Sequence, residues 1–398
     1  MYSKVGIELN SSSIINKLKR NSNLKVRESN FELMRIISML FIILWHIIIH
    51  GHMIENCTSN AIQEYLKIIE FIIIVHVDSF IVVSGYFQSK SKFKLSKLLS
   101  LILQVVMYSF IIYLISIRVG LVNDYNKISI VQKMLPSTTG SYWFISTYII
   151  VYILSDFINK FIEKLSRQEF KNLLMLLFVV FSVIPYITGG RILRNDGYNF
   201  YNFIFLYMIG AYLRRYPLKD SYHFRNLSIN GYRVFLVGVF LGCVILNHLI
   251  TRYAFTVQDY DNFFADFSSR IMDGYMGYSS MFVIIQTVCF FEFFRYINIK
   301  SRVINYISSC TFGIYLFHEN NSVRSTIYHF FKIDNGAYSS YKMLIYMFVV
   351  MFGIFILGVI IETIRKIIIQ LISRLGIVKK IINGFKDFCL SFNLKINW

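Results

Sequence analysis

The chain has 398 residues, of which 56% are hydrophobic, 17% are aromatic and only 16% are charged. Soluble domains carry about 25% charged residues, so this composition excludes an ordinary soluble domain and a disordered chain, and the content of 3 Pro and 5 Cys excludes collagen-like and disulfide-dense classes. The net charge of +19 could indicate a nucleic-acid partner, but phosphate-binding grooves lie on well-charged soluble scaffolds, and we expect a membrane protein that binds no nucleic acid.

Long apolar stretches recur along the whole sequence. Crossing the hydrocarbon core of a bilayer takes about 20 mostly apolar helical residues, and about ten stretches come close to that length. Because only helices and closed barrels satisfy every backbone group in lipid, runs this long predict an all-α, polytopic membrane bundle. The expected spans are residues 36–54, 67–87, 98–117, 142–159, 172–188, 200–213, 233–251, 276–294, 303–319 and 342–363.

The basic residues predict the orientation of these spans. Of the 41 Lys and Arg residues, 29 lie in the two terminal segments and alternate loops, and only eight lie in the loops of the opposite side. Lys and Arg mark the cytoplasmic side, so both termini are expected in the cytoplasm, as an even number of spans requires. The chain then divides into a basic cytoplasmic tail (1–30), a membrane domain (31–363) and a basic amphipathic tail (364–398) on the inner leaflet.

Two ionisable residues in the first expected span are candidate functional residues, because charged side chains are costly within a bilayer. Ten residues separate Arg35 from His46, which places them on one helix face, about 16 Å apart along the axis. Arg binds phosphate in a bidentate manner, and neutral His is the usual general base. The pair suits a long phosphorylated donor whose reactive end lies near His46. The alternative is an Arg35 that reaches lipid headgroups and a His46 that is hydrogen-bonded within the bundle.

A metal site is the weaker interpretation of the histidines in this segment. His46 and His50 have the i, i+4 spacing of metal ligands. However, no Glu follows the first His, no Cys or Asp completes a set nearby, and the five cysteines are scattered. We therefore expect no bound metal.

Five motifs follow one another along about 290 residues. The first is NFELMRIISMLFIILWHIIIHG (30–51), with Arg, ten residues and then His. The others are VDSFIVVSGYF (77–87), SYWFISTYIIVYIL (141–154), FLYMIGAYLRR (205–215) and ISSCTFGIYLFHEN (307–320). Each is weak alone, but the ordered set resembles the acyltransferase-3 family of integral membrane acyltransferases, whose hallmark in the first span is matched by Arg35 and His46.

The resemblance implies transfer of an acyl group, most often acetyl, from cytoplasmic acyl-CoA to a hydroxyl of a carbohydrate at or beyond the membrane. In that reaction His46 would take the proton of the hydroxyl, or carry the acyl group covalently, and Arg35 would hold donor phosphates or stabilise developing charge. The expected acceptor is a bacterial surface or capsular polysaccharide, or its lipid-linked precursor, and the expected location is the bacterial plasma membrane.

One departure from the family concerns the donor. Many members carry an Arg-x-x-Arg motif after Ser-Gly-Tyr, and this chain has Lys94, Lys97 and Ser100 in that region. These lysines could attract the phosphates of CoA as point charges, without the bidentate geometry of arginine.

Four further residues are expected to contribute to substrate binding. Asp78 would orient or charge-balance His46 or Arg35, and His318 would position the acceptor or the thioester carbonyl. Trp143 would stack on a sugar ring. Ser84 is the fourth expected substrate-binding residue, and it precedes a glycine that permits close helix packing or a re-entrant break. Structural roles remain the alternative for each, and for Trp143 an interfacial aromatic belt is the favoured interpretation.

Two other classes of protein share the basic, polytopic pattern. A polysaccharide flippase or polymerase would be expected to have acidic or Arg-rich outer loops, whereas the loops here are sparse in charge. A non-catalytic sensor on the same fold is the second alternative, and the presence of both Arg35 and His46 argues against it.

Overall fold

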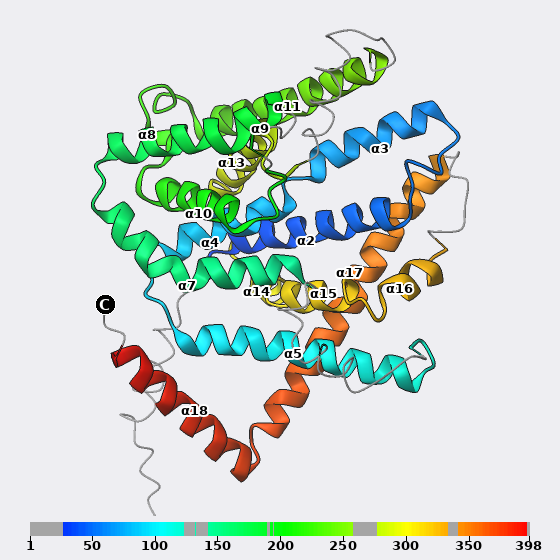
Figure 1. The fold of residues 1–398 in the computed structure, drawn as a ribbon, viewed down its shortest axis with the longest axis vertical. Helices are drawn as coiled ribbons and strands as arrows, with labels where there is room; N and C mark the ends of the chain where they lie inside the picture. Colours follow the sequence, from blue (N-terminus) through cyan, green and yellow to red (C-terminus); the bar gives the residue numbers. More distant parts are fainter. Residues whose placement is uncertain are drawn as a thin grey trace, which may run out of the picture.

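The computed structural model describes residues 27–122, 132, 142–188, 192–193, 195–257, 277–332 and 341–395. Throughout this part of the chain the backbone forms helices joined by turns and short loops, with no β-strand (Figure 1). The expected all-α class is therefore confirmed.

Six helical segments of the described residues are long and apolar enough to cross a membrane. They are α2 (Ser29–His50), α5 (Leu95–Arg118), α7 (Trp143–Glu163), the run of α8 (Arg167–Phe178), η1 (Val179–Val183) and α9 (Ile184–Thr188), α11 (Ile229–Val257) and α17 (Tyr341–Ile372). Their length and composition agree with a multi-pass membrane protein. The count of ten spans and the cytoplasmic position of the termini stay predictions.

The other four expected spans contain shorter or interrupted helices. This explains why they are not among the helices that are long enough to cross a membrane. They correspond to α3 (Asn60–Ile73) with α4 (His76–Gln88), α10 (Phe200–Arg215), α13 (Met281–Arg295), and α14 (Arg302–Ser308) with α15 (Thr311–His318). The breaks fall at residues 74–75 and 309–310. Backbone that leaves the helix at membrane depth is tolerated where it is buried in protein or lines a cavity, and both interruptions border the cavity described below.

Helix α2 lies at the centre of the bundle, in contact with α3, α4, α13, α14, α15 and α17 (Figure 1). Its side chains Phe31, Met34, Ile43 and Ile47 are almost fully buried. Such burial on several sides is typical of a helix surrounded by other helices rather than by lipid. The helix that carries Arg35 and His46 is therefore held by the rest of the fold.

Two glycines allow α4 and α10 to cross at close range. A Cβ atom added at Gly85 would overlap the backbone carbonyl of Tyr207, and one added at Gly210 would overlap the carbonyl of Val82. Small residues allow this kind of backbone approach between membrane helices. The Ser84-Gly85 pair thus has the packing role that its sequence suggested, with the glycine as the residue that makes the contact.

A buried carboxylate joins α5 to α17. Glu362 is 1% exposed and accepts hydrogen bonds from the Tyr108 hydroxyl at 2.6 Å and from Arg365 Nε at 2.7 Å. Because a buried charge is tolerated only when it is paired and hydrogen-bonded, this cluster fixes the two helices together.

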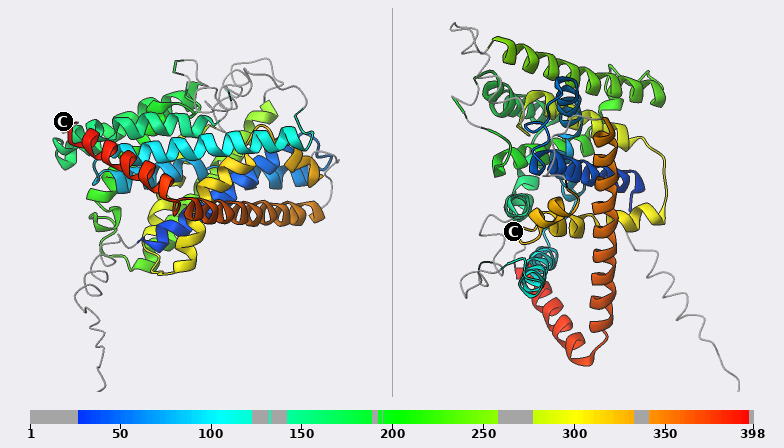
Figure 2. Two further views of the ribbon diagram at one scale, coloured as in Figure 1. Left: turned by 90° about the horizontal axis from the view of Figure 1, so that it is seen from below. Right: turned by 90° about the vertical axis from the view of Figure 1, so that its right-hand side faces the viewer.

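The C-terminal segment folds back beside the bundle. Helix α18 (Gly376–Lys395) turns from the end of α17 and reaches α5 (Figures 1 and 2). It carries exposed Phe388 and Leu390 together with exposed Lys380 and Lys386. This mixture agrees with an amphipathic tail, and its position on the inner leaflet remains a prediction.

Candidate active site

A single cavity of about 880 Å³ contains both Arg35 and His46 in its lining. Other lining residues come from α4, α5, α7, α10, α14 and α15, so the cavity lies inside the helix bundle. It follows α2 from Arg27, before the first turn, to His50 at the last residue of the helix. The two residues predicted to share a helix face therefore open onto one continuous space, about 16 Å apart along the axis.

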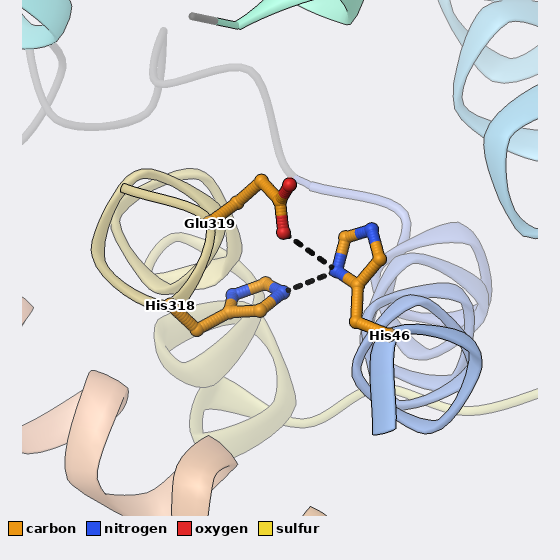
Figure 3. A group of neighbouring side chains, drawn as sticks. All are labelled: His46, His318 and Glu319. Carbon is orange, nitrogen blue, oxygen red and sulfur yellow. Dashed lines mark hydrogen bonds and ion pairs between the residues drawn. The ribbon is translucent and has the colours of Figure 1, made fainter. Parts of the chain in front are cut away.

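His46 lies beside two residues that follow one another at the end of α15. Its Nδ1 atom is 3.1 Å from His318 Nε2 and 3.1 Å from a carboxylate oxygen of Glu319 (Figure 3). His318 is fully buried, whereas His46 lines the cavity. The structure thus brings together two of the predicted residues, His46 and His318, and adds Glu319.

The hydrogen-bond pattern determines which nitrogen of His46 is free. His318 Nδ1 lies 2.7 Å from the Ile314 carbonyl, which can only accept, so His318 Nδ1 carries the hydrogen. In a neutral imidazole the other nitrogen is then an acceptor, and His318 Nε2 accepts from His46 Nδ1–H. The Glu319 carboxylate lies 3.1 Å from the same nitrogen as an ion-pair partner, without a hydrogen bond. His46 therefore keeps Nε2 unprotonated, as a general base requires.

Glu319 has basic side chains on both sides. Arg324 donates to one carboxylate oxygen at 2.7 Å, and His50 Nε2 lies 3.6 Å from the other, which also faces His46. Glu319 is not among the residues predicted from the sequence. Its position directly after His318 and five residues before an arginine was the available signal, but nothing in the sequence shows that the helix ends there and turns the carboxylate toward α2.

Arg35 lines the cavity as an ion-paired side chain. It donates to Glu32 at 2.8 Å, and its guanidinium lies 5.7 Å from the centre of the Phe87 ring. Glu32 is buried and also accepts a hydrogen bond of 2.5 Å from the Ser308 hydroxyl, at the end of α14. Glu32 therefore orients Arg35 and links α2 to the break between α14 and α15.

Aromatic side chains surround the end of the cavity near His46. Trp143 lies 4.5 Å from the Tyr198 ring and is stacked on Tyr278 at 6.0 Å, measured between ring centres. The Tyr278 hydroxyl lies 3.3 Å from His76 Nε2, and all four side chains line the cavity. Trp143, predicted from the sequence to contact a sugar, is thus on the cavity wall.

The remaining predicted residues are divided between the cavity and the surrounding core. Ser84 and Lys97 line the cavity, whereas Lys94 does not. Asp78 is fully buried outside the lining, and within the described part of the chain neither of its carboxylate oxygens has a hydrogen-bond partner. The structure places Glu319, and not Asp78, against His46.

The donor set around His46 also has the composition of a metal site. The ligand atoms of His46, His318 and Glu319 all lie within 4.8 Å of one another, and two imidazoles with one carboxylate are ligands that zinc accepts. The hydrogen bond between His46 and His318 and the ion pair between His46 and Glu319 account for these contacts without an ion, but the Glu319 oxygen that faces His46 accepts no hydrogen bond within the described residues. The two interpretations differ in the tautomer of His46, because metal on Nδ1 would leave the hydrogen on Nε2.

Comparison with known proteins supports one family. A family model described as an acyltransferase domain matches residues 28–363, which is most of the chain. No curated protein and no solved structure matches. The matched region contains α2, the cavity and the His46–His318–Glu319 cluster.

Proposed function

Since the chain belongs to the acyltransferase-3 family and is a membrane acyltransferase, we propose that it moves an acetyl group from acetyl-CoA to a hydroxyl of a carbohydrate. The proposed acceptor is a surface or capsular polysaccharide, or its lipid-linked precursor, at the bacterial plasma membrane. The observation that carries this proposal is the geometry of His46, which presents one free nitrogen to the cavity and has the other fixed by Glu319 and His318.

The cavity suits a long donor that enters from the predicted cytoplasmic end. Arg35 and Lys97 lie toward that end, where phosphate groups would find positive charge. About 16 Å of α2 separates Arg35 from His46, and the aliphatic side chains Met39, Ile42 and Leu101 also line the wall. A donor whose phosphates lie near Arg35 would reach His46 with its thioester.

His46 would act first as base and then as acid. Its Nε2 takes the proton from the acceptor hydroxyl as the oxygen attacks the thioester carbonyl. The tetrahedral intermediate then collapses with cleavage of the C–S bond, and the thiolate takes the proton back from His46. Glu319 stabilises the imidazolium that exists between the two steps, as a buried carboxylate does beside a catalytic histidine.

The acceptor would bind at the opposite end of the cavity. Trp143, Tyr198 and Tyr278 offer aromatic faces there, and such faces pack against the apolar side of a sugar ring. Hydroxyl and imidazole groups of the same wall supply the few convergent polar contacts typical of a ligand pocket.

The deciding experiment compares the surface glycan of cells that express the wild-type protein or H46A. We expect the ester content, measured by NMR, to be lost in H46A and kept in the control H52A, because His52 is exposed and lies outside the cavity lining. Full ester content in H46A would contradict the enzymatic proposal. A deletion strain that loses glycan export, and not glycan acylation, would indicate a flippase instead.

A further inference from the structure

The predicted cytoplasmic end of the cavity is rich in positive charge. Five basic side chains line the cavity there, and we call them the basic mouth: Arg27, Arg35, Lys90, Lys97 and Arg214. Among the described residues, only Glu28 and Glu32 oppose them in this part of the lining. A cleft lined by an excess of one charge concentrates ligands of the opposite charge.

Arg214 is a member of the basic mouth whose side chain is 30% exposed. Its guanidinium carbon lies over the ring of Tyr86, 4.5 Å from the ring centre, and one of its nitrogens lies 3.8 Å from a carboxylate oxygen of Glu28. The contact with Glu28 is an ion pair, and Arg214 makes no hydrogen bond within the part of the chain that the structure describes. A cation–π contact of this kind holds a guanidinium over the ring without using its N–H groups as hydrogen-bond donors.

Neighbouring arginines have their donors engaged. Arg215 donates to the Ile162 carbonyl at 2.7 Å, and Arg295, which also lies over Tyr86, donates to the Leu213 carbonyl at 2.8 Å and to Glu292 at 3.1 Å. Neither lines the cavity. The two consecutive arginines at the end of α10 therefore differ: one supports the fold, and the other faces the cavity.

We propose that Arg214 binds the phosphate groups of the acyl-CoA donor, with Tyr86 as the residue that orients it. This inference rests on the proposed function. After Ser-Gly-Tyr the chain offers lysines, which attract phosphate as point charges, whereas a guanidinium binds it through two parallel hydrogen bonds. Arg214 supplies that geometry from α10, and the crossing of α4 and α10 at Gly85 brings it onto Tyr86.

The test uses two donors that differ in their phosphates. Purified wild-type protein, R214Q and R214K are assayed with acetyl-CoA and with S-acetylpantetheine, which carries the same thioester without any phosphate. We expect R214Q to raise KM for acetyl-CoA about 10- to 100-fold, the usual range for a lost hydrogen bond to a charged group, and to leave kcat/KM for S-acetylpantetheine unchanged. R214K should restore only part of the loss, because it keeps the charge without the bidentate geometry.

The matched control is R215Q, which alters the neighbouring arginine outside the cavity and should change neither donor's KM. Adenosine 3′,5′-bisphosphate provides a second measurement, and we expect it to inhibit the wild-type protein against acetyl-CoA and to inhibit R214Q at least tenfold more weakly. An equal loss of activity with both donors in R214Q, or unchanged inhibition, would overturn the role of Arg214. Wild-type protein that transfers acetyl from neither donor would refute the proposed function itself.

Discussion

At the scale of single residues, the chemistry depends on one nitrogen of His46. The chain of contacts from the Ile314 carbonyl through His318 to His46 Nδ1 fixes the tautomer, and Glu319 adds a negative charge beside the same N–H. A fixed tautomer with a neighbouring carboxylate is what makes a histidine effective in proton transfer. The cluster is therefore preorganised on rigid helices before any substrate binds.

The first prediction concerns Glu319. E319Q keeps the shape of the side chain but removes the charge that stabilises the His46 imidazolium, so we expect kcat to fall about 100- to 10,000-fold with little change in KM for acetyl-CoA. Steady-state kinetics on purified protein measures both constants. The control is E55Q, because Glu55 is exposed and lies outside the cavity lining. Unchanged kcat in E319Q would show that the carboxylate has no part in the proton transfer.

The second prediction separates hydrogen bonding from metal binding at the same atoms. If His46 Nδ1 carries a hydrogen, treatment with EDTA or 1,10-phenanthroline and removal of the chelator should leave kcat unchanged. Activity that is lost on chelation and returns with added Zn²⁺ would instead assign His46, His318 and Glu319 as metal ligands, and would require another base.

The sequence predicted part of this site for a clear reason. Arg35 and His46 belong to one helix, and helical periodicity alone places them on one face. Glu319 and Glu32 act through contacts with other helices, and no single sequence shows which helices are neighbours. Asp78 is the converse case: a carboxylate within an apolar span indicates function, but Asp78 is not among the residues that line the cavity.

At the scale of helices, the crossing of α4 and α10 sets the position of the basic mouth. G85A would push a methyl group into the Tyr207 backbone, which cannot move as a flexible side chain can. We expect a loss of about 1–3 kcal/mol in stability, measured as a lower Tm in detergent. The matched control is G242A on α11, where no atom lies within 4 Å of the added Cβ, so Tm should stay unchanged or rise. Equal Tm values for the two variants would contradict the close crossing.

Among the helices, some could be predicted from the sequence and others could not. Long apolar runs such as α5 and α17 were predictable because hydropathy and length determine a helix in lipid. The interruptions at residues 74–75 and 309–310 contain neither Pro nor Gly. They place His76 and Thr311 at the cavity wall, so the breaks reflect tertiary packing around the site, which local sequence does not encode.

At the scale of the whole molecule, orientation decides whether the donor can reach the basic mouth. Basic residues mark the cytoplasmic side, so the loop after α2 should lie outside and the loop before α5 inside. In intact cells, a membrane-impermeant maleimide should label E55C, and it should label K92C only after permeabilisation; both native side chains are exposed. The five native cysteines are buried, which keeps the background low. The reverse labelling pattern would show that the basic mouth faces away from the cytoplasm, where acyl-CoA is found. That result would overturn the proposed donor and would leave the geometry of His46 intact.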